Sequence, residues 1–169
     1  TAIRNRMFDY EQLLRSAAAL LDLHPDTTRE DWRRYTESVR LEDSYPGAQG
    51  LGFAQVIKAE DLQRHQDTVR AEGFPAYAVR PAGERELYTS IVFLEPFSGR
   101  NLRAFGFDMF SETVRRDAMS VARDTGQPAL SGKVTLLQEN ERAPQAGVLL
   151  YMPVYAPSKP LNTEQDRRS

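Results

Sequence analysis

The stretch LRAFGFDMFSETVRRDAMSVARDTGQPALS, Leu102 to Ser131, decides the predicted fold, because a buried-looking strand leads directly into a helix. The strand is the apolar run from Ala104 to Met109. Gly106 stands inside this run, and a glycine in a strand pattern indicates that another backbone or a ligand comes close. Ser111 can cap the helix that follows, and Gly126 can end it. The stretch therefore predicts a strand–helix–strand unit.

The helix within this stretch has one apolar face. Small or branched apolar residues recur at helical spacing, namely Val114, Ala118, Val121 and Ala122. Arg115 and Arg116 fall between these positions, and we expect both on the outer, solvated face.

Two other segments belong to the same pattern. They are PGAQGLGFAQVI at Pro46 to Ile57 and GVLLYMPVY at Gly147 to Tyr155. Together with the first stretch, and in this order, they closely resemble the CHASE domain, an extracytoplasmic sensor module. The resemblance implies a ligand-sensing domain set between membrane spans of a receptor histidine kinase of a two-component system, a diguanylate cyclase or a related signalling enzyme. Plant cytokinin receptors are the best-known members.

The predicted fold class is α+β. Hairpin-length loops join most of the predicted strands, which indicates antiparallel sheets. The resemblance implies a long N-terminal helix that carries two PAS-like lobes. Residues 1–155 are then the sensor domain, with a helical stalk region (1–45), a membrane-distal lobe (46–130) and the start of a membrane-proximal lobe (131–155). Residues 156–169 are expected to be a polar tail of a truncated domain, since relatives continue with another apolar strand.

The first predicted helix, Arg4 to Leu23, has an apolar seam in alternating steps of four and three. The seam consists of Ile3, Met7, Tyr10, Leu14, Ala17 and Leu21. Such a seam suits packing on the chain's own domain or in a parallel dimer, and both interpretations remain open. Because it covers only about three heptads, we expect at most a weak homodimer.

Local signals predict the remaining elements. Overlapping capping boxes precede a second helix, formed by Thr27 with Glu30 and by Thr28 with Asp31. Trp32, Tyr35 and Val39 share one side of that helix and should be core. Further elements are a strand from Leu51 to Val56, a helix from Ala59 to Glu72, strands at 77–79 and 88–94, and a closing pair near 134–137 and 148–154.

Composition excludes several classes of protein. The 169 residues carry 22 basic and 24 acidic side chains without a basic run, so no nucleic-acid partner is expected. The absence of cysteine excludes disulfides, thiol catalysis and cysteine-ligated metal. No apolar run reaches the roughly 20 residues of a membrane span, so membrane contact is expected only through flanking spans outside this sequence. The resemblance implies the periplasmic or extracellular part of an inner or plasma membrane protein.

Candidate catalytic features fit structural roles better. Asp124-Thr125-Gly126 copies the aspartic protease triplet, but it falls in the last turn of a helix instead of a loop after a strand. The two histidines, His24 and His65, have no nucleophile at motif spacing. We therefore expect no catalytic residue, no metal site and no cofactor.

A ligand site is the alternative, formed by aromatic strand residues with polar groups among them. The candidates are Phe53, Tyr77, Tyr88, Phe93, Phe105, Phe107, Asp108, Ser131 and Tyr151. Each could equally fill the core. Asp108 must be paired, capped or ligand-facing, because burying a lone carboxylate costs several kcal/mol. We expect it to cap the helix that begins near Ser111 or to pair with Arg115 or Arg116. The resemblance to cytokinin receptors adds Glu95, in the acidic position after the strand YTSIVFLEP, and implies an adenine-type or other small organic ligand.

Three functions follow from these observations. The favoured one is a sensor that binds a small molecule and converts occupancy into movement of the first helix. The second is a binding-silent dimerisation or partner-sensing scaffold. The third and least supported is a hydrolase.

Overall fold

The computed structural model describes residues 2–136, 146–157 and 161–168. The helices are α1 (Ala2–Leu23), α2 (Arg29–Ser38), α3 (Leu41–Ser44), α4 (Leu62–Ala71), α5 (Thr113–Thr125) and α6 (Glu164–Arg168), with three 3-10 helices, η1 (Ala59–Asp61), η2 (Gly99–Ala104) and η3 (Met109–Ser111). The strands are β1 (Leu51–Lys58), β2 (Leu87–Glu95), β3 (Ala129–Leu130), β4 (Val134–Thr135), β5 (Ala146–Gly147) and β6 (Leu150–Tyr151). The long first helix and the antiparallel sheets confirm the α+β class.

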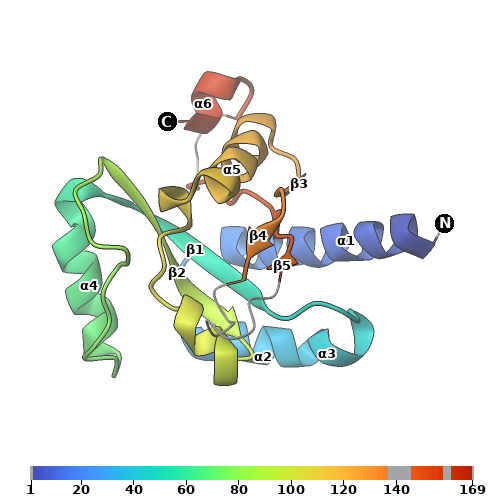
Figure 1. Ribbon diagram of the computed structural model, residues 1–169, viewed down its shortest axis with the longest axis horizontal. Helices are drawn as coiled ribbons and strands as arrows, with labels where there is room; N and C mark the ends of the chain where they lie inside the picture. Colours follow the sequence, from blue (N-terminus) through green and yellow to red (C-terminus); the bar gives the residue numbers. More distant parts are fainter. Residues whose placement is uncertain (1, 137–145, 158–160, 169) are drawn as a thin grey trace.

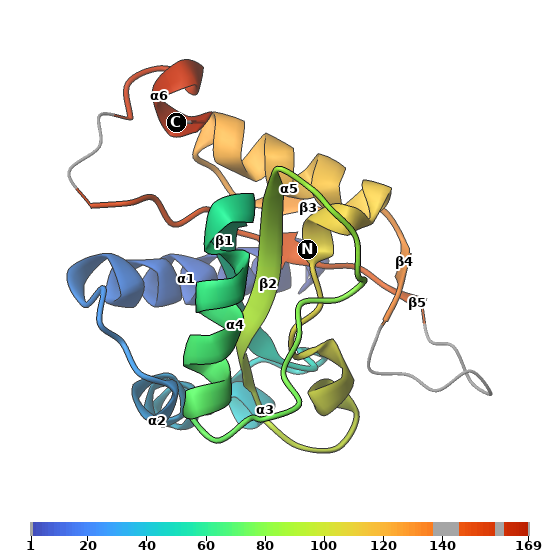
Figure 2. The ribbon, with the colours of Figure 1, turned by 90° about the vertical axis from the view of Figure 1, so that its left-hand side faces the viewer.

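The antiparallel pair of β1 and β2 runs through the middle of the molecule, and its two strands are joined through η1 and α4 instead of a short hairpin loop. Its strands pair antiparallel, with Ile57 opposite Tyr88, and the register shifts between Phe53 and Ala54. Helices α5 and α6 lie at one end of this pair of strands, and α2 and α3 lie at the other (Figure 2). Two shorter antiparallel pairs, β3 with β6 and β4 with β5, are the other sheets of the described chain. Strands occur within both predicted closing segments, at Val134–Thr135 and Leu150–Tyr151, but they pair with β5 and β3 and not with each other. Leu137 lies outside the described residues. The two PAS-like lobes and the domain boundaries stay predictions.

The two halves of α1 have different surroundings. In the C-terminal half, Leu13 and Ala17 are buried in a cluster with Trp32 of α2. In the N-terminal half, Ile3 and Phe8 are 78% and 60% exposed. Figure 1 shows this half extending past β4 and β5 to the edge of the molecule. The helix therefore packs on its own domain mainly through its C-terminal half, with Tyr10 adding a hydrogen bond to the Pro46 carbonyl at 2.6 Å.

The start of α2 follows its sequence signal. Thr28 is the N-cap, its hydroxyl accepts from the Asp31 N–H at 3.1 Å, and the Asp31 carboxylate accepts from the Thr28 N–H at 3.0 Å. This reciprocal pair satisfies two of the free donors of the first turn. The cap sets the start of α2 and so the side on which Trp32 lies. Trp32 is 1% exposed and donates from Nε1 to the Leu51 carbonyl at 3.2 Å. The prediction for this helix is confirmed.

The run from Ala104 to Met109 is not the continuous strand that the sequence predicts. It lies beside β2, with the Gly106 N–H donating to the Ile91 carbonyl at 2.9 Å, but forms only isolated bridges between η2 and η3. Gly106 has a φ of +83°, a left-handed conformation that interrupts a ladder. A Cβ there would stand 2.6 Å from the Ala78 carbonyl oxygen. The predicted close backbone approach at Gly106 is confirmed.

Helix α5 corrects two predictions. Its N-cap is Glu112, whose carboxylate accepts from the next backbone N–H groups, while Ser111 closes η3. Arg115 is not on the solvated face: it is 5% exposed and donates to the Thr135 carbonyl at 2.8 Å. The outer position belongs instead to Val121, which is 53% exposed. Ala118 and Ala122 are buried as predicted, so the difference concerns Arg115 and Val121. Arg115 turns inward because β4 offers it a backbone acceptor that local spacing does not reveal.

The segment expected to be a polar tail contains α6, which packs on α5. Arg168 pairs with the Asp124 carboxylate at 2.6 Å, and Arg167 donates to the Asp124 carbonyl at 2.6 Å. Arg168 and Arg123 lower the pKa of Asp124 well below its usual range. Asp124 therefore has a structural role at the end of α5. Among the described residues, no helix is long and apolar enough to span a bilayer.

Candidate ligand-binding site

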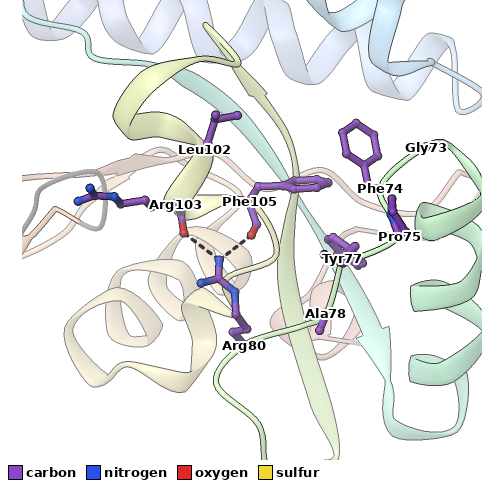
Figure 3. A pocket seen from close by; sticks show the side chains of 10 residues that line it. Gly73, Phe74, Pro75, Tyr77, Ala78, Arg80, Leu102, Arg103 and Phe105 are labelled. Carbon is purple, nitrogen blue, oxygen red and sulfur yellow. Dashed lines mark hydrogen bonds between the residues drawn. The ribbon is translucent and has the colours of Figure 1, made fainter.

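An open hollow lies between the end of α4 and η2. Its volume is about 720 Å³, and it is lined by residues 73–78 together with Arg80, Leu102, Arg103 and Phe105. The Gly73 turn that ends α4 places one wall, and the residues leading from η2 to Gly106 place the other (Figure 3). Small-molecule sites commonly have volumes of roughly 300–1,000 Å³ and mostly apolar walls with a few polar groups. The hollow, defined by these lining residues, fits that description.

Aromatic rings form its inner wall. The Phe105 ring centre lies 4.9 Å from that of Tyr77 and 5.0 Å from that of Phe74, the latter pair edge to face. Such ring pairs hold each other's orientation, so the wall is preformed. Leu102, which is 47% exposed, adds an apolar side chain at the opening. A flat or apolar ligand body would find complementary surface here.

Arg80 is the central cation of the hollow. Its Nη2 donates to the carbonyls of Arg103 and Phe105, at 2.8 and 2.7 Å (Figure 3). These bonds fix the guanidinium beside the wall, and its other N–H groups make no hydrogen bond within the described part of the chain. Arg103 extends outward at the rim (Figure 3), and its side chain has no partner among the described residues. None of the ten lining residues is acidic.

A buried hydrogen-bonded chain stands behind Tyr77. The Tyr77 hydroxyl lies 2.6 Å from Ser90 Oγ and 2.8 Å from His65 Nε2. Ser90 is fully buried on β2, so it is not accessible as a nucleophile. Burial raises the pKa of Tyr77 and lowers that of His65. The chain orients Tyr77 in the wall and ties α4 to β2.

Arg29 of α2 contacts the same aromatic wall. Its guanidinium carbon lies within 6 Å of four phenylalanine ring centres: Phe74 at 4.6 Å, Phe105 at 5.1 Å, Phe93 at 5.4 Å and Phe97 at 5.9 Å. A cation over several ring faces is attracted by each quadrupole. We call Arg29 and these four rings the Arg29 cluster. Two of its rings, Phe74 and Phe105, also line the hollow.

Hydrogen bonds hold Arg29 in this position. It donates to the Val92 carbonyl of β2 and pairs with the Glu72 carboxylate at 2.9 Å. Its Nε is buried without a hydrogen-bond partner in the described structure. Arg29 thus joins the start of α2 to β2, to the end of α4 and to the wall of the hollow.

Asp108 has structural partners that differ from those expected. It is fully buried, accepts from the Thr89 and Phe110 N–H groups at 2.9 and 3.1 Å, and pairs with Arg85 Nε at 2.9 Å. It caps η3 rather than α5, and Arg85 takes the place expected for Arg115 or Arg116. With these donors the carboxylate is satisfied inside the protein.

The structure brings two of the ten sequence candidates, Tyr77 and Phe105, to the hollow. The other candidates do not line the hollow. Phe53 and Phe93 pack with Trp32, and Phe107 packs by Ala104 and under Arg115. The polar candidates form hydrogen bonds within the chain: Tyr88 with Gly83 and Arg85, Glu95 with the Phe97 N–H, Ser131 with Gly132 and Leu149, and Tyr151 with Met109 Sδ. Burial raises the pKa of Tyr151. Whether any of these residues contacts a ligand stays a prediction.

Sequence reasoning missed four conspicuous residues of the hollow. Phe74 follows the helix-ending Gly73 and had a signal, since an aromatic directly after a C-cap glycine commonly packs back on its helix. Arg80, Leu102 and Arg103 had none, because each is exposed and indistinguishable in sequence from a solvated position. Among the described residues, no group of three or more His, Cys, Asp or Glu could hold a metal ion.

Comparison with known families identifies the family of this chain. The family model for the CHASE domain matches residues 25–169, which is most of the chain. The chain therefore belongs to the CHASE domain family, a family of extracytoplasmic sensor domains of signalling receptors. The match confirms the resemblance noted in the sequence. No curated protein matches the chain.

Proposed function

We propose that this chain is the ligand-binding part of a transmembrane receptor of the histidine kinase or diguanylate cyclase type, and that a small organic molecule binds in the hollow. The supporting observation is a preformed aromatic wall beside an arginine whose Nε and Nη1 make no hydrogen bond to the described residues, in a chain of a sensor family. The chain itself carries out no reaction. It would stand on the periplasmic or extracellular side of the membrane.

We further propose that ligand binding is transmitted through the Arg29 cluster. A ligand that moves Phe74 or Phe105 changes the surroundings of Arg29, which lies in the first turn of α2. Helix α2 in turn contacts α1, where the Tyr35 hydroxyl donates to the Leu13 carbonyl at 3.4 Å. A ligand can shift the position of these helices only as far as it binds one arrangement more tightly than another. The contiguous contacts support this route.

The exposed half of α1 supports weak self-association as an additional property. Ile3 and Phe8 present apolar side chains beyond the part of α1 that packs on the domain. Two copies could pair along this half, but it is too short to hold a tight dimer, because short isolated helices are marginal in water. Dimerisation would therefore depend on the rest of the receptor.

A thermal-shift screen tests the ligand proposal. The chain is heated with a library of small organic metabolites, alongside an Ala76→Trp variant in which the new ring fills the hollow from an exposed position. Ala19→Trp, on the exposed side of α1, is the matched control. We expect compounds that raise Tm in the wild type and the control but not in Ala76→Trp. Compounds that stabilise all three proteins equally would refute the hollow as the site.

A further inference from the structure

We propose that the ligand of the hollow is an organic anion: a carboxylate or comparable acidic group on a flat or apolar body. The inference rests on the proposed function, since it names the chemical class of molecule that the same site takes. It follows from the arrangement of charge in the hollow. The cations there are Arg80 and Arg103, and no lining residue offers a carboxylate to neutralise them.

Arg80 has the geometry of an anion anchor. Two backbone carbonyls hold its Nη2, so the plane of the guanidinium is fixed before a ligand arrives. Its Nε and Nη1 N–H groups have no hydrogen-bond partner within the described residues, and Arg80 is one of the residues that line the hollow. A fixed guanidinium with free N–H groups matches the geometry of a carboxylate, and charge-assisted bonds of this kind are about twice as strong as neutral ones.

The walls favour an organic rather than an inorganic anion. Phe74, Tyr77 and Phe105 present ring surface on the side of the hollow opposite the Arg103 side chain (Figure 3). Leu102 is exposed at the opening and has apolar surface that a ligand body could cover. Phosphate or sulfate would leave this surface in water. A molecule with an acidic group at Arg80 and a ring against Phe105 would use both features.

Three phenyl probes of similar size and different charge test the inference: phenylacetate, phenethyl alcohol and phenethylamine. Adenine is added as a neutral heterocycle. Each is titrated into the full 169-residue chain, and backbone amide NMR shifts report both affinity and location. We expect phenylacetate to shift the amides of residues 73–80 and 102–105 and to bind about tenfold more tightly than phenethyl alcohol. Phenethylamine should bind least.

Variants locate the charge effect. Arg80→Gln should weaken phenylacetate binding about tenfold and leave phenethyl alcohol nearly unchanged. Arg103→Gln, at a rim position whose side chain has no partner among the described residues, should weaken phenylacetate binding by about two- to threefold. It should fold normally even if Arg80→Gln does not. Arg6→Gln on the exposed half of α1 removes the same charge far from the hollow and should change nothing.

The outcomes separate this inference from the proposed function. If adenine or phenethyl alcohol binds in the hollow as tightly as phenylacetate, the anion inference is overturned and ligand binding there stands. The inference is likewise overturned if phenylacetate shifts only distant amides. It is also overturned if Arg80→Gln and Arg103→Gln both bind phenylacetate as tightly as the wild type does. If no probe shifts residues 73–80 or 102–105, the anion inference fails, and the metabolite screen with Ala76→Trp decides the proposed function separately.

Discussion

The guanidinium of Arg29 stands 4.6 Å from the ring centre of Phe74, so the first turn of α2 contacts a side chain that lines the hollow. The same arginine donates to the Val92 carbonyl and pairs with Glu72. A single side chain therefore joins α2, β2 of the central sheet and the end of α4. This contact is the structural basis for proposing that α2 responds to a ligand.

Arg29→Lys should destabilise the chain by about 1–2 kcal/mol, because an ammonium cannot reproduce the planar guanidinium over several rings while donating to two acceptors. Urea unfolding measures the change. Arg34→Lys, at an exposed position of the same helix, is the control and should stay within about 0.5 kcal/mol of wild type. Equal stability of the two variants would show that the Arg29 cluster contributes no free energy of folding.

Gly106→Ala should destabilise the chain by about 3 kcal/mol or more and disturb the wall of the hollow. The substitution places a Cβ 2.6 Å from the Ala78 carbonyl oxygen and also strains a φ of +83°. Gly99→Ala separates these causes, since Gly99 has a φ of +54° and no atom within 4 Å of a Cβ. That control should cost only about 1 kcal/mol. If the two variants lose the same stability, the close approach at Gly106 is not what constrains this position.

Local signals explain which parts of the fold were predictable. The capping box of Thr28 and Asp31 marks the start of α2, and Gly126 marks the end of α5. Both caps are made by residues close in sequence, so their patterns can be recognised without the structure. The prediction of a continuous strand from Ala104 to Met109 was wrong because Gly106, in a left-handed conformation, interrupts the strand pairing. Apolar periodicity in a sequence carries no information about φ. The prediction that Arg115 lies on the solvated face was wrong because its acceptor, the Thr135 carbonyl, belongs to a different element.

The hollow was predictable only in part for the same reason. Tyr77 and Phe105 could be proposed because aromatic residues near strands are rarely solvated. Arg80 could not, because its position depends on carbonyls of Arg103 and Phe105 that are more than 20 residues away. The site forms where the turn after α4 meets the distant 3-10 helix η2. Its residues therefore have no characteristic spacing that a single sequence could show.

Acidification should weaken the fold through His65. Burial lowers the pKa of His65 in the folded chain below its ordinary value of 6.5, so the unfolded chain binds the proton more readily. The stabilising contribution of neutral His65 is fully present above about pH 7 and is lost as the pH falls through 6.5 toward the lower folded-state pKa. The free energy of unfolding, measured from about pH 7.5 to pH 5, should fall more steeply in wild type than in His65→Gln.

His24→Gln is the comparison for that experiment, since His24 is exposed beyond the end of α1. Its pH profile should follow the wild type. A His65→Gln profile that coincides with both would mean that the contact between His65 and Tyr77 does not couple protonation to folding.

The two halves of α1 should respond oppositely to a charge. Leu13→Asp buries a carboxylate in the cluster with Trp32 and should cost several kcal/mol, whereas Phe8→Asp, at a 60% exposed position, should leave folding unchanged. Sedimentation equilibrium should show a monomer or weak dimer for wild type and less association for Phe8→Asp. A tight dimer at micromolar concentration would contradict the assignment of the helix faces.

Hydrogen–deuterium exchange with the compound that most raises Tm tests most directly whether the hollow is a sensory site connected to the helices. We predict slower exchange in residues 73–80 and 102–105, together with a change in α2, and we predict that Ala76→Trp abolishes both effects. Protection that appears only outside the hollow, or that persists in Ala76→Trp, would contradict the account.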